Sequence, residues 1–240
     1  MSKKLTVLAY HSISNEYNDL LTISPKRLEK HIIFLIKKQF EIIDIQNIEK
    51  IKKKSFVITF DDGFEDFYIN GFKLLKKYNI SPIIFICPNL IGNFFEGKKI
   101  LNINQIKELS NNGVIIGSHS LTHKRLTEIE NKKEMYEELY NSKKKLEDLL
   151  TQNIDYFCPP YNCINHQIEQ LILELGYKKI FISPLNNYKY YNQNPNYIVR
   201  TPIYRNDNNL LFRLKLTDFY QELKKNDKIL LYLRKLKKII

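Results

Sequence analysis

Two short polar strings contain the side chains of this sequence that could do chemistry. Residues 59–63, TFDDG, supply two adjacent carboxylates, and residues 119–123, HSLTH, supply two imidazoles. One carboxylate and two imidazoles can hold a divalent metal ion, and the second carboxylate is then left to act as a base. Three protein ligands leave one coordination position open for water, which distinguishes a catalytic metal site from a structural one. The two strings together therefore predict a catalytic metal site.

The apolar runs around these strings predict the fold that positions them. Residues 56–58 and 114–116 precede the two strings and are typical of buried strands, and similar runs alternate with helical patterns along the chain. This alternation favours an α/β fold with a mostly parallel sheet. The predicted strands are residues 5–10, 55–60, 82–87, 114–117, 155–158, 178–182 and 197–203. We expect a distorted (β/α)7-type barrel, smaller than the eight-fold one, with its site at the C-terminal strand ends.

Helical patterns fill the intervals between these strands. Ser24 and Pro25 are typical N-cap and first residues of a helix, and the long charged stretch 131–150 carries one apolar stripe. Residues 186–196 are rich in Asn and Tyr and show little periodicity, so we expect a surface loop near the site there.

The C-terminal part of the chain has a different composition. Residues 210–240 carry leucines at near-helical spacing with lysines and arginines between them, Lys215 among them. A basic amphipathic helix of this kind can lie in a membrane interface, although leucines packed on the barrel beside solvated lysines explain the pattern equally well. We therefore divide the chain into a catalytic barrel, residues 1–205, and a basic amphipathic tail, residues 206–240, with peripheral membrane contact as a candidate role of the tail.

The composition limits partners and compartment. The formal net charge of +12 can attract nucleic acid, anionic lipid or acidic substrates. We expect no nucleic-acid partner, because no helix-turn-helix, zinc-finger or RNP-like pattern is found. Three cysteines without a CxxC motif indicate a reducing compartment. We find neither a signal peptide nor a transmembrane segment, so we expect a cytoplasmic protein that is peripheral at the inner leaflet if the tail binds lipid.

The two polar strings resemble the first two motifs of the polysaccharide deacetylase family (the NodB-homology domain, carbohydrate esterase family 4), and the resemblance extends over residues 5–205. It implies that Asp62, His119 and His123 hold a divalent metal ion and that Asp61 is the catalytic base. Zinc is the expected ion for one carboxylate and two imidazoles, while cobalt, nickel or ferrous iron would fit the same ligands.

The third family motif is changed in this chain. It ends in an Arg-Pro-Pro-Tyr-like string, which reads CPPY at residues 158–161. The resemblance implies that Tyr161 lines the groove and offers its backbone N–H to the oxyanion. Cys158 stands where the family has the arginine that orients the base. Arg200, in a string like the Arg-x-Pro-Ile of related deacetylases, is the candidate for that role, and a surface arginine at a strand end is the alternative.

The family's late Leu-x-His motif, which supplies the general acid, is absent, because no histidine follows His166. His11 ends the first predicted strand. It resembles the acid of the circularly permuted poly-N-acetylglucosamine deacetylases, in which a Tyr-His pair on the first strand has this role. A closed barrel can hold the same position in space although the chain order changes. The alternative for His11 is a core histidine, and we interpret His31 and His166 as structural residues without a catalytic role.

The resemblance implies a metal-dependent hydrolase that removes an N-acyl group, expected to be acetyl, from an amino sugar. Three alternatives stay open: a non-catalytic glycan-binding module on the same barrel, a deformylase of a lipid-linked amino sugar, and a basic accessory protein associated with membrane or nucleic acid, which only the charge suggests. The sequence leaves the sugar, its carrier, the native metal and the oligomeric state undecided.

Overall fold

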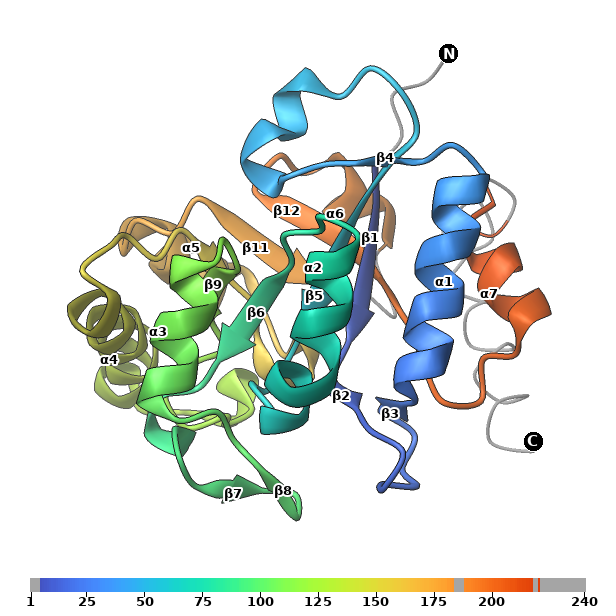
Figure 1. The fold of residues 1–240 in the computed structure, drawn as a ribbon. Helices are drawn as coiled ribbons and strands as arrows, with labels where there is room; N and C mark the ends of the chain where they lie inside the picture. The colour runs from blue at the N-terminus through green and yellow to red at the C-terminus, as the bar shows by residue number, and fades with distance from the viewer. Residues whose placement is uncertain (1–4, 184–187, 218–219, 221–240) are drawn as a thin grey trace.

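Seven parallel strands form a closed barrel in the computed structural model, which describes residues 5–183, 188–217 and 220 (Figure 1). These strands are β1 (Leu5–Tyr10), β5 (Ser55–Phe60), β6 (Ile83–Ile86), β9 (Ile115–Ser118), β10 (Tyr156–Phe157), β11 (Lys179–Ile182) and β12 (Tyr197–Pro202). The order around the barrel is β1, β12, β11, β10, β9, β6 and β5, and β5 pairs with β1 to close the ring. The predicted (β/α)7-type barrel is confirmed, and every strand lies within one residue of its predicted bounds.

Helices cover the outside of the barrel, and short strands lie at its ends (Figure 1). The helices are α1 (Pro25–Lys37), α2 (Lys73–Lys77), α3 (Ile103–Asn111), α4 (Lys132–Leu150), α5 (His166–Glu174), α6 (Tyr188–Gln193) and α7 (Asn209–Lys215). The short strands are β2 (Ser12–Ile13), β3 (Thr22–Ile23), β4 (Glu41–Ile42) and the hairpin β7 (Phe94–Phe95) with β8 (Lys98–Lys99). Within the described ranges, no helix has the length and apolar character needed to cross a membrane.

Side-chain hydrogen bonds cap the N-termini of α1 and α4, two helices that the sequence predicts. The Ser24 hydroxyl accepts a hydrogen bond from the Arg27 N–H, and Pro25 occupies the first turn of α1. The Asn131 side chain accepts from the backbone N–H groups of the first turn of α4. Each side chain satisfies a donor that would otherwise lack a partner at the helix start.

Side chains that face the barrel interior change from apolar to polar toward its C-terminal mouth. Alternate residues of a strand face the same side. In β5, Val57 belongs to the interior apolar cluster, and Asp61 lies four residues further along the same alternation. Ile198 and Arg200 follow the same alternation in β12. The strand period therefore brings the polar residues that end the strands to one place.

Close packing inside the barrel requires a glycine in β9. A Cβ atom on Gly117 would lie 2.5 Å from the Phe85 ring and 3.1 Å from the carbonyl oxygen of Tyr156. The Phe85 ring fills the space that a side chain would take, and it also packs against Phe181 across the interior. Gly117 thus allows the Phe85 and Phe181 rings to pack closely in the barrel interior.

One segment differs from its prediction. Residues 186–196, expected to form a loop, contain helix α6. The buried carboxylate of Glu169 on α5 holds this segment, because Tyr190 Oη and Asn194 Nδ2 each donate to it at 3.0 Å. The prediction of a loop is wrong because this partner lies on another element and leaves no trace in the local periodicity.

The first part of the predicted tail packs on α1, and Figure 1 shows α7 beside that helix. Phe212 is buried, and its ring stacks on His31 with centroids 3.7 Å apart. Lys215, predicted among the basic residues of an exposed face, is instead buried and pairs with Asp207. Residues 221–240 lie outside the described residues. The tail boundary at residue 206 and its membrane contact stay predictions.

His31 is a buried neutral residue that joins α1 to both β1 and α7. Its Nδ1 lies 3.1 Å from the Tyr10 hydroxyl, and the side chain is almost completely buried. Burial, with the nearby charges of Arg27 and Lys215, lowers the pKa of His31 to about 3. The unfolded chain, with an ordinary histidine pKa, therefore binds this proton more readily than the folded chain.

We predict that His31 makes folding stability fall as the pH is lowered. The folded pKa is depressed, so the full stability is present above pH about 6.5 and is lost progressively toward pH 3. Between pH 7 and pH 5, the wild-type protein should lose about 2 kcal/mol more unfolding free energy than His31→Gln. Urea unfolding of metal-free protein at the two pH values measures this difference. Equal losses in both proteins would contradict the prediction.

Candidate metal centre and active site

Three buried side chains converge on one point at the mouth of the barrel. Asp62 Oδ1 lies 3.1 Å from His123 Nε2 and 3.4 Å from His119 Nε2. One ligand atom from each residue lies within 4.8 Å of the other two, which is close enough for all three to bind the same metal ion. Burial alone would raise the pKa of Asp62, but hydrogen bonds from the two imidazoles reverse this effect and lower that pKa. The carboxylate is therefore ionised and ready to bind a cation.

Left-handed backbone conformations direct these side chains toward one another. Asp62 follows β5 with φ 69°, and Gly63 continues the turn with φ 73°. His123 has φ 65° in the turn after β9. A left-handed conformation at a non-glycine residue costs on the order of 1–3 kcal/mol and persists only where the surroundings enforce it. Here the strain accompanies the arrangement that brings the three ligands together.

The tautomer of His119 suits metal binding. Its Nδ1 lies 2.6 Å from the carbonyl oxygen of Cys158. Because a carbonyl oxygen only accepts, Nδ1 carries a proton, so in the neutral ring Nε2 has the lone pair that a metal ion would bind. A hydrogen bond of this kind on the far nitrogen usually fixes a metal-binding histidine. His123 Nδ1 is buried and has no hydrogen-bond partner within the described residues.

Asp61 is held by Arg200 in a two-pronged ion pair. Arg200 Nη1 lies 2.6 Å from Asp61 Oδ1, and Nη2 lies 2.9 Å from Oδ2. Both side chains are buried. Burial alone would raise the pKa of Asp61, but the Arg200 guanidinium and the His11 ring outweigh burial and hold that pKa below its ordinary value. Asp61 is therefore a carboxylate of fixed orientation beside the metal-binding group.

Arg200 comes to this carboxylate from the last barrel strand. Its Nη2 also lies 3.0 Å from Cys158 Sγ, and its Nη1 lies 3.2 Å from the hydroxyl of Thr59. The sequence left a surface arginine open as an alternative, and the burial of Arg200 excludes it. The guanidinium thus contacts both Asp61 and Cys158, the residue that replaces the motif-three arginine.

A second group of metal-binding residue types, Asp61, His119 and Cys158, also lies close together. Its chemistry is less suitable for a metal ion. Arg200 already binds both oxygens of Asp61 and contacts the Cys158 sulfur. Burial raises the pKa of the Cys158 thiol, which opposes the thiolate form that binds metals. The group of Asp62, His119 and His123 is the better metal centre.

One pocket of about 250 Å³ contains all the residues that the sequence predicted for the site. The pocket is lined by His11, Asp61, Asp62, His119, His123, Tyr161 and Arg200. These residues come from strand ends or adjoining turns spread over most of the chain. The closed barrel brings them together.

His11 and Tyr161 both line the pocket, and each contacts a different residue of the charged centre. His11 Nε2 is 3.8 Å from Asp61 Oδ2, and its side chain is 18% exposed, so the ring can reach a molecule in the pocket. Tyr161 is 45% exposed, has φ 56°, and places its ring 4.8 Å from the His123 ring. The Arg125 guanidinium covers the Tyr161 ring at 4.1 Å. Tyr161 is thereby held at the edge of the pocket.

Sequence reasoning missed several residues that line this pocket, among them Phe95, Glu96 and Ser183. The Phe95 ring, from the β7–β8 hairpin, lies 4.6 Å from the His123 ring, and Glu96 follows it. Ser183, directly after β11, has a buried hydroxyl that finds no partner in the described part of the chain. The position of Ser183 at a strand end was a usable signal. No local pattern identified the hairpin.

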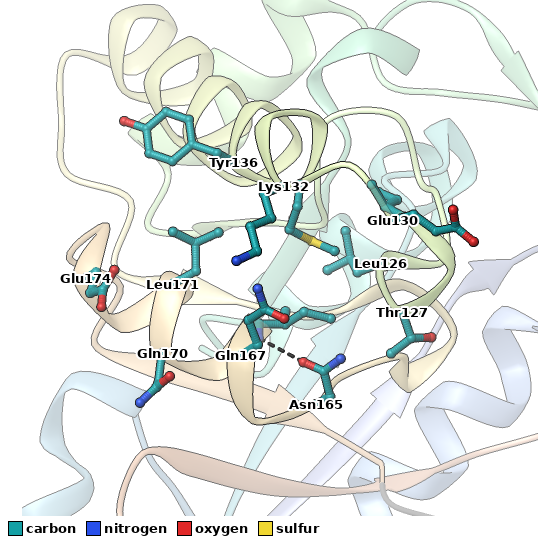
Figure 2. Close-up of a pocket in the computed structure, with 13 residues that line it drawn as sticks. Leu126, Thr127, Glu130, Lys132, Tyr136, Asn165, Gln167, Gln170, Leu171 and Glu174 are labelled. Carbon is teal, nitrogen blue, oxygen red and sulfur yellow. Dashed lines mark hydrogen bonds between the residues drawn. The ribbon is translucent and has the colours of Figure 1, made fainter.

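A larger cleft of about 380 Å³ lies between α4 and α5 (Figure 2). Figure 2 shows Leu126 and Leu171 in it beside polar side chains such as Lys132 and Gln167. None of the predicted site residues lines this cleft. The candidate catalytic residues lie in the smaller pocket at the barrel mouth.

Proteins similar to this chain in sequence are named as deacetylases. The protein named "Putative polysaccharide deacetylase YxkH" of Bacillus subtilis is 28% identical over 182 residues, which cover 73% of this chain and 63% of that protein. The peptidoglycan-N-acetylmuramic acid deacetylase PdaA of Bacillus subtilis is 30% identical over 139 residues, covering 55% and 48% respectively. The chain thus spans less than two thirds of the length of either relative.

The fold has a close counterpart among solved structures. IcaB from Ammonifex degensii superposes with a TM-score of 0.76 at 18% identity, over 90% of this chain and 98% of that one. The model of the family described as polysaccharide deacetylase matches residues 49–180, which include both polar strings and the strands before them. Because this match covers more than half of the chain, the protein belongs to the polysaccharide deacetylase family.

Proposed function

We propose that this protein is a metal-dependent hydrolase that removes the N-acetyl group from an amino sugar of a glycan or glycan precursor. One observation carries the proposal. The carboxylate of Asp61, which Arg200 binds, lines the same pocket as Asp62, His119 and His123. A fixed base beside a three-ligand metal centre is the arrangement that metal-assisted hydrolysis of an amide needs. Membership of the family supports an acetylated sugar as the substrate.

The residues of the metal centre fit a zinc ion. They supply one carboxylate oxygen and two imidazole nitrogens, a donor set that zinc accepts and that leaves a position open. The hydrogen bond from His119 Nδ1 to Cys158 leaves the other ring nitrogen free for the ion. A bound zinc ion would polarise the amide carbonyl and make water a stronger acid.

The remaining residues have separate roles in the proposed reaction. Asp61 accepts the proton of the attacking water, and Arg200 keeps its two oxygens in a fixed orientation. The backbone N–H of Tyr161 stabilises the negative charge that develops on the carbonyl oxygen. His11, which lies beside Asp61 in the pocket, gives a proton to the departing amine. Each role is a proposal that rests on the family resemblance and is compatible with the position of the residue in the pocket.

We predict that the metal centre needs both histidines. Wild-type protein should contain about one divalent metal ion per chain by elemental analysis. His119→Ala and His123→Ala should each lower the metal content and the activity severely, because two ligands hold an ion much less tightly than three. His166→Ala is the matched control, since His166 lies on α5 with a side chain that is 76% exposed. Full metal retention in both site variants would show that the ion binds elsewhere.

We predict that Asp61 and Arg200 act on turnover without holding the ion. Asp61→Asn should keep the metal content and reduce kcat by at least about a hundredfold, because it removes the proton acceptor. Arg200→Lys should also reduce kcat, since a lysine cannot bind both carboxylate oxygens at once. Metal content and steady-state kinetics are measured on the same preparations. A normal kcat in Asp61→Asn would exclude Asp61 as the base.

We predict that His11 matters most for poor leaving groups. His11→Ala should slow hydrolysis of the sugar amide by roughly a hundredfold, the usual contribution of a positioned acid. Hydrolysis of an activated acetate ester should be affected much less, because its leaving group needs no proton. The ratio of the two rates in wild type and variant isolates this effect. If both substrates slow equally, His11 serves structure or binding instead.

Mass spectrometry of N-acetylated oligosaccharides tests the function directly. Zinc-loaded protein should convert the substrate into products that have lost one or more acetyl groups, and Asp61→Asn should not. An N-formylated substrate in parallel distinguishes a deformylase from a deacetylase. If the zinc-loaded protein binds the glycans but leaves every N-acyl group in place, the protein is a glycan-binding module and the proposal is wrong.

A further inference from the structure

Helix α4 contacts the His-x3-His turn from behind through a buried carboxylate. Glu138 is 3% exposed, and its Oε2 accepts hydrogen bonds from the backbone N–H groups of Leu121 and Thr122, each at 3.0 Å. Its Oε1 accepts from the Thr122 hydroxyl. A buried charge is tolerated only when such donors satisfy it. Both oxygens of Glu138 are therefore used to hold the turn between the two histidines.

One helical turn further along α4, Ser142 contacts the same segment. Its hydroxyl donates to the carbonyl oxygen of Ser120 at 2.9 Å and lies 2.7 Å from the Ser118 hydroxyl. Ser142 is completely buried. Residues four apart on a helix share a face, so Glu138 and Ser142 form one polar contact surface in an otherwise apolar interface.

The turn needs such support because its conformation is unfavourable for its residues. Ser120 has φ 60° and His123 has φ 65°, and the turn contains no glycine. Within the turn, the Ser120 hydroxyl accepts from the His123 N–H at 3.1 Å. The N–H groups of Leu121 and Thr122 point to the Glu138 carboxylate. Without that acceptor, two buried donors would lack a partner, and the turn would relax toward another conformation.

We propose that Glu138 and Ser142 are positioning residues that set the geometry of His119 and His123 for metal binding. The inference rests on the proposed metal centre. Neither residue is among the candidate metal ligands. They act through the backbone between the histidines, which determines the distance and angle at which the two imidazoles meet Asp62. Residues that orient metal ligands typically contribute a factor of 10 to 100 in metal affinity.

A methionine cannot replace Glu138 in this role, whereas a glutamine can do so in part. Both carboxylate oxygens accept hydrogen bonds from donors of the turn. A glutamine keeps one oxygen for the two N–H groups, and its amide nitrogen can donate to the Thr122 hydroxyl, which both donates and accepts. Methionine is of similar length and has no oxygen acceptor, so Glu138→Met removes all of these contacts. That variant is the specific test, and Glu138→Gln should retain most of the zinc affinity.

The test measures zinc affinity by competition with a chromophoric chelator and the visible spectrum of the cobalt(II) protein. Glu138→Met should bind zinc about 10 to 100 times more weakly than wild type, with an altered cobalt spectrum. Glu137→Met is the matched control, because Glu137 is exposed on the same helix and pairs only loosely with Lys133 at 3.8 Å. It should behave like wild type.

Leu146→Ala separates positioning from general stability. Leu146 is a buried core residue of α4, one turn beyond Ser142. The substitution should lower the melting temperature of the metal-free protein and leave the zinc affinity of the folded protein unchanged. An equal loss of affinity in Leu146→Ala and Glu138→Met would overturn the proposal, because any weakening of the helix would then have the same effect.

Other outcomes also decide the matter. Zinc affinity in Glu138→Met within twofold of wild type would overturn the inference and leave the proposed metal centre intact. If Glu138→Met does not fold, Ser142→Ala decides: an altered cobalt spectrum supports the proposal, and a wild-type spectrum overturns it. A wild-type protein that binds no zinc would contradict the metal centre itself, and the inference would fail with it.

Discussion

The buried ion pair of Asp61 and Arg200 links β5 and β12, the two strands that pair with β1 in the closed barrel. Asp61 follows β5 and Arg200 lies in β12, and these strands are neighbours on either side of β1. Taking either charge out of water is expensive, and the cost is offset only because the two groups bind each other in a two-pronged geometry. Removal of Arg200 would leave a buried carboxylate without its partner. The same contact thus stabilises the barrel and orients the proposed base.

The metal centre depends on a different kind of constraint. Its ligands lie in turns with left-handed residues, which no local preference of the chain would select. Rigid elements beneath these turns hold them. The hydrogen bond from His119 to the Cys158 carbonyl and the carboxylate of Glu138 on α4 both act on the His-x3-His segment. The site therefore combines strained turns with a firm support, an arrangement typical of functional centres.

Much of this arrangement could be predicted from the sequence. The barrel strands are short apolar runs, and the alternation of side chains then places the polar strand ends at one mouth. His11 was predicted from its resemblance to the Tyr-His pair of the permuted deacetylases, and the closed barrel can place it at the site because β1 and β5 are adjacent although far apart in the chain. Arg200 was one of two open interpretations, and only its contact with Asp61 decides between them.

The rest could not be predicted because it depends on contacts between distant elements. Glu138 lies in a charged helix, where a glutamate is normally solvated, and nothing local distinguishes it from Glu137. Lys215 fits the sequence pattern of a basic helix face, but in the structure it is buried and pairs with Asp207. Phe95 reaches the site from a hairpin without a strong strand pattern. In each case a tertiary contact determines the environment of the residue, and the periodicity of the local sequence does not reveal that contact.

The central claim is that the barrel mouth holds one metal ion between Asp62, His119 and His123, beside a base fixed by Arg200. Anomalous diffraction at the zinc absorption edge, from crystals of the zinc-loaded protein, tests this claim most directly. We predict a single strong peak within coordination distance of Asp62 Oδ1 and of the Nε2 atoms of His119 and His123. A peak at Asp61 and Cys158 instead, or no peak at the barrel mouth, would contradict it.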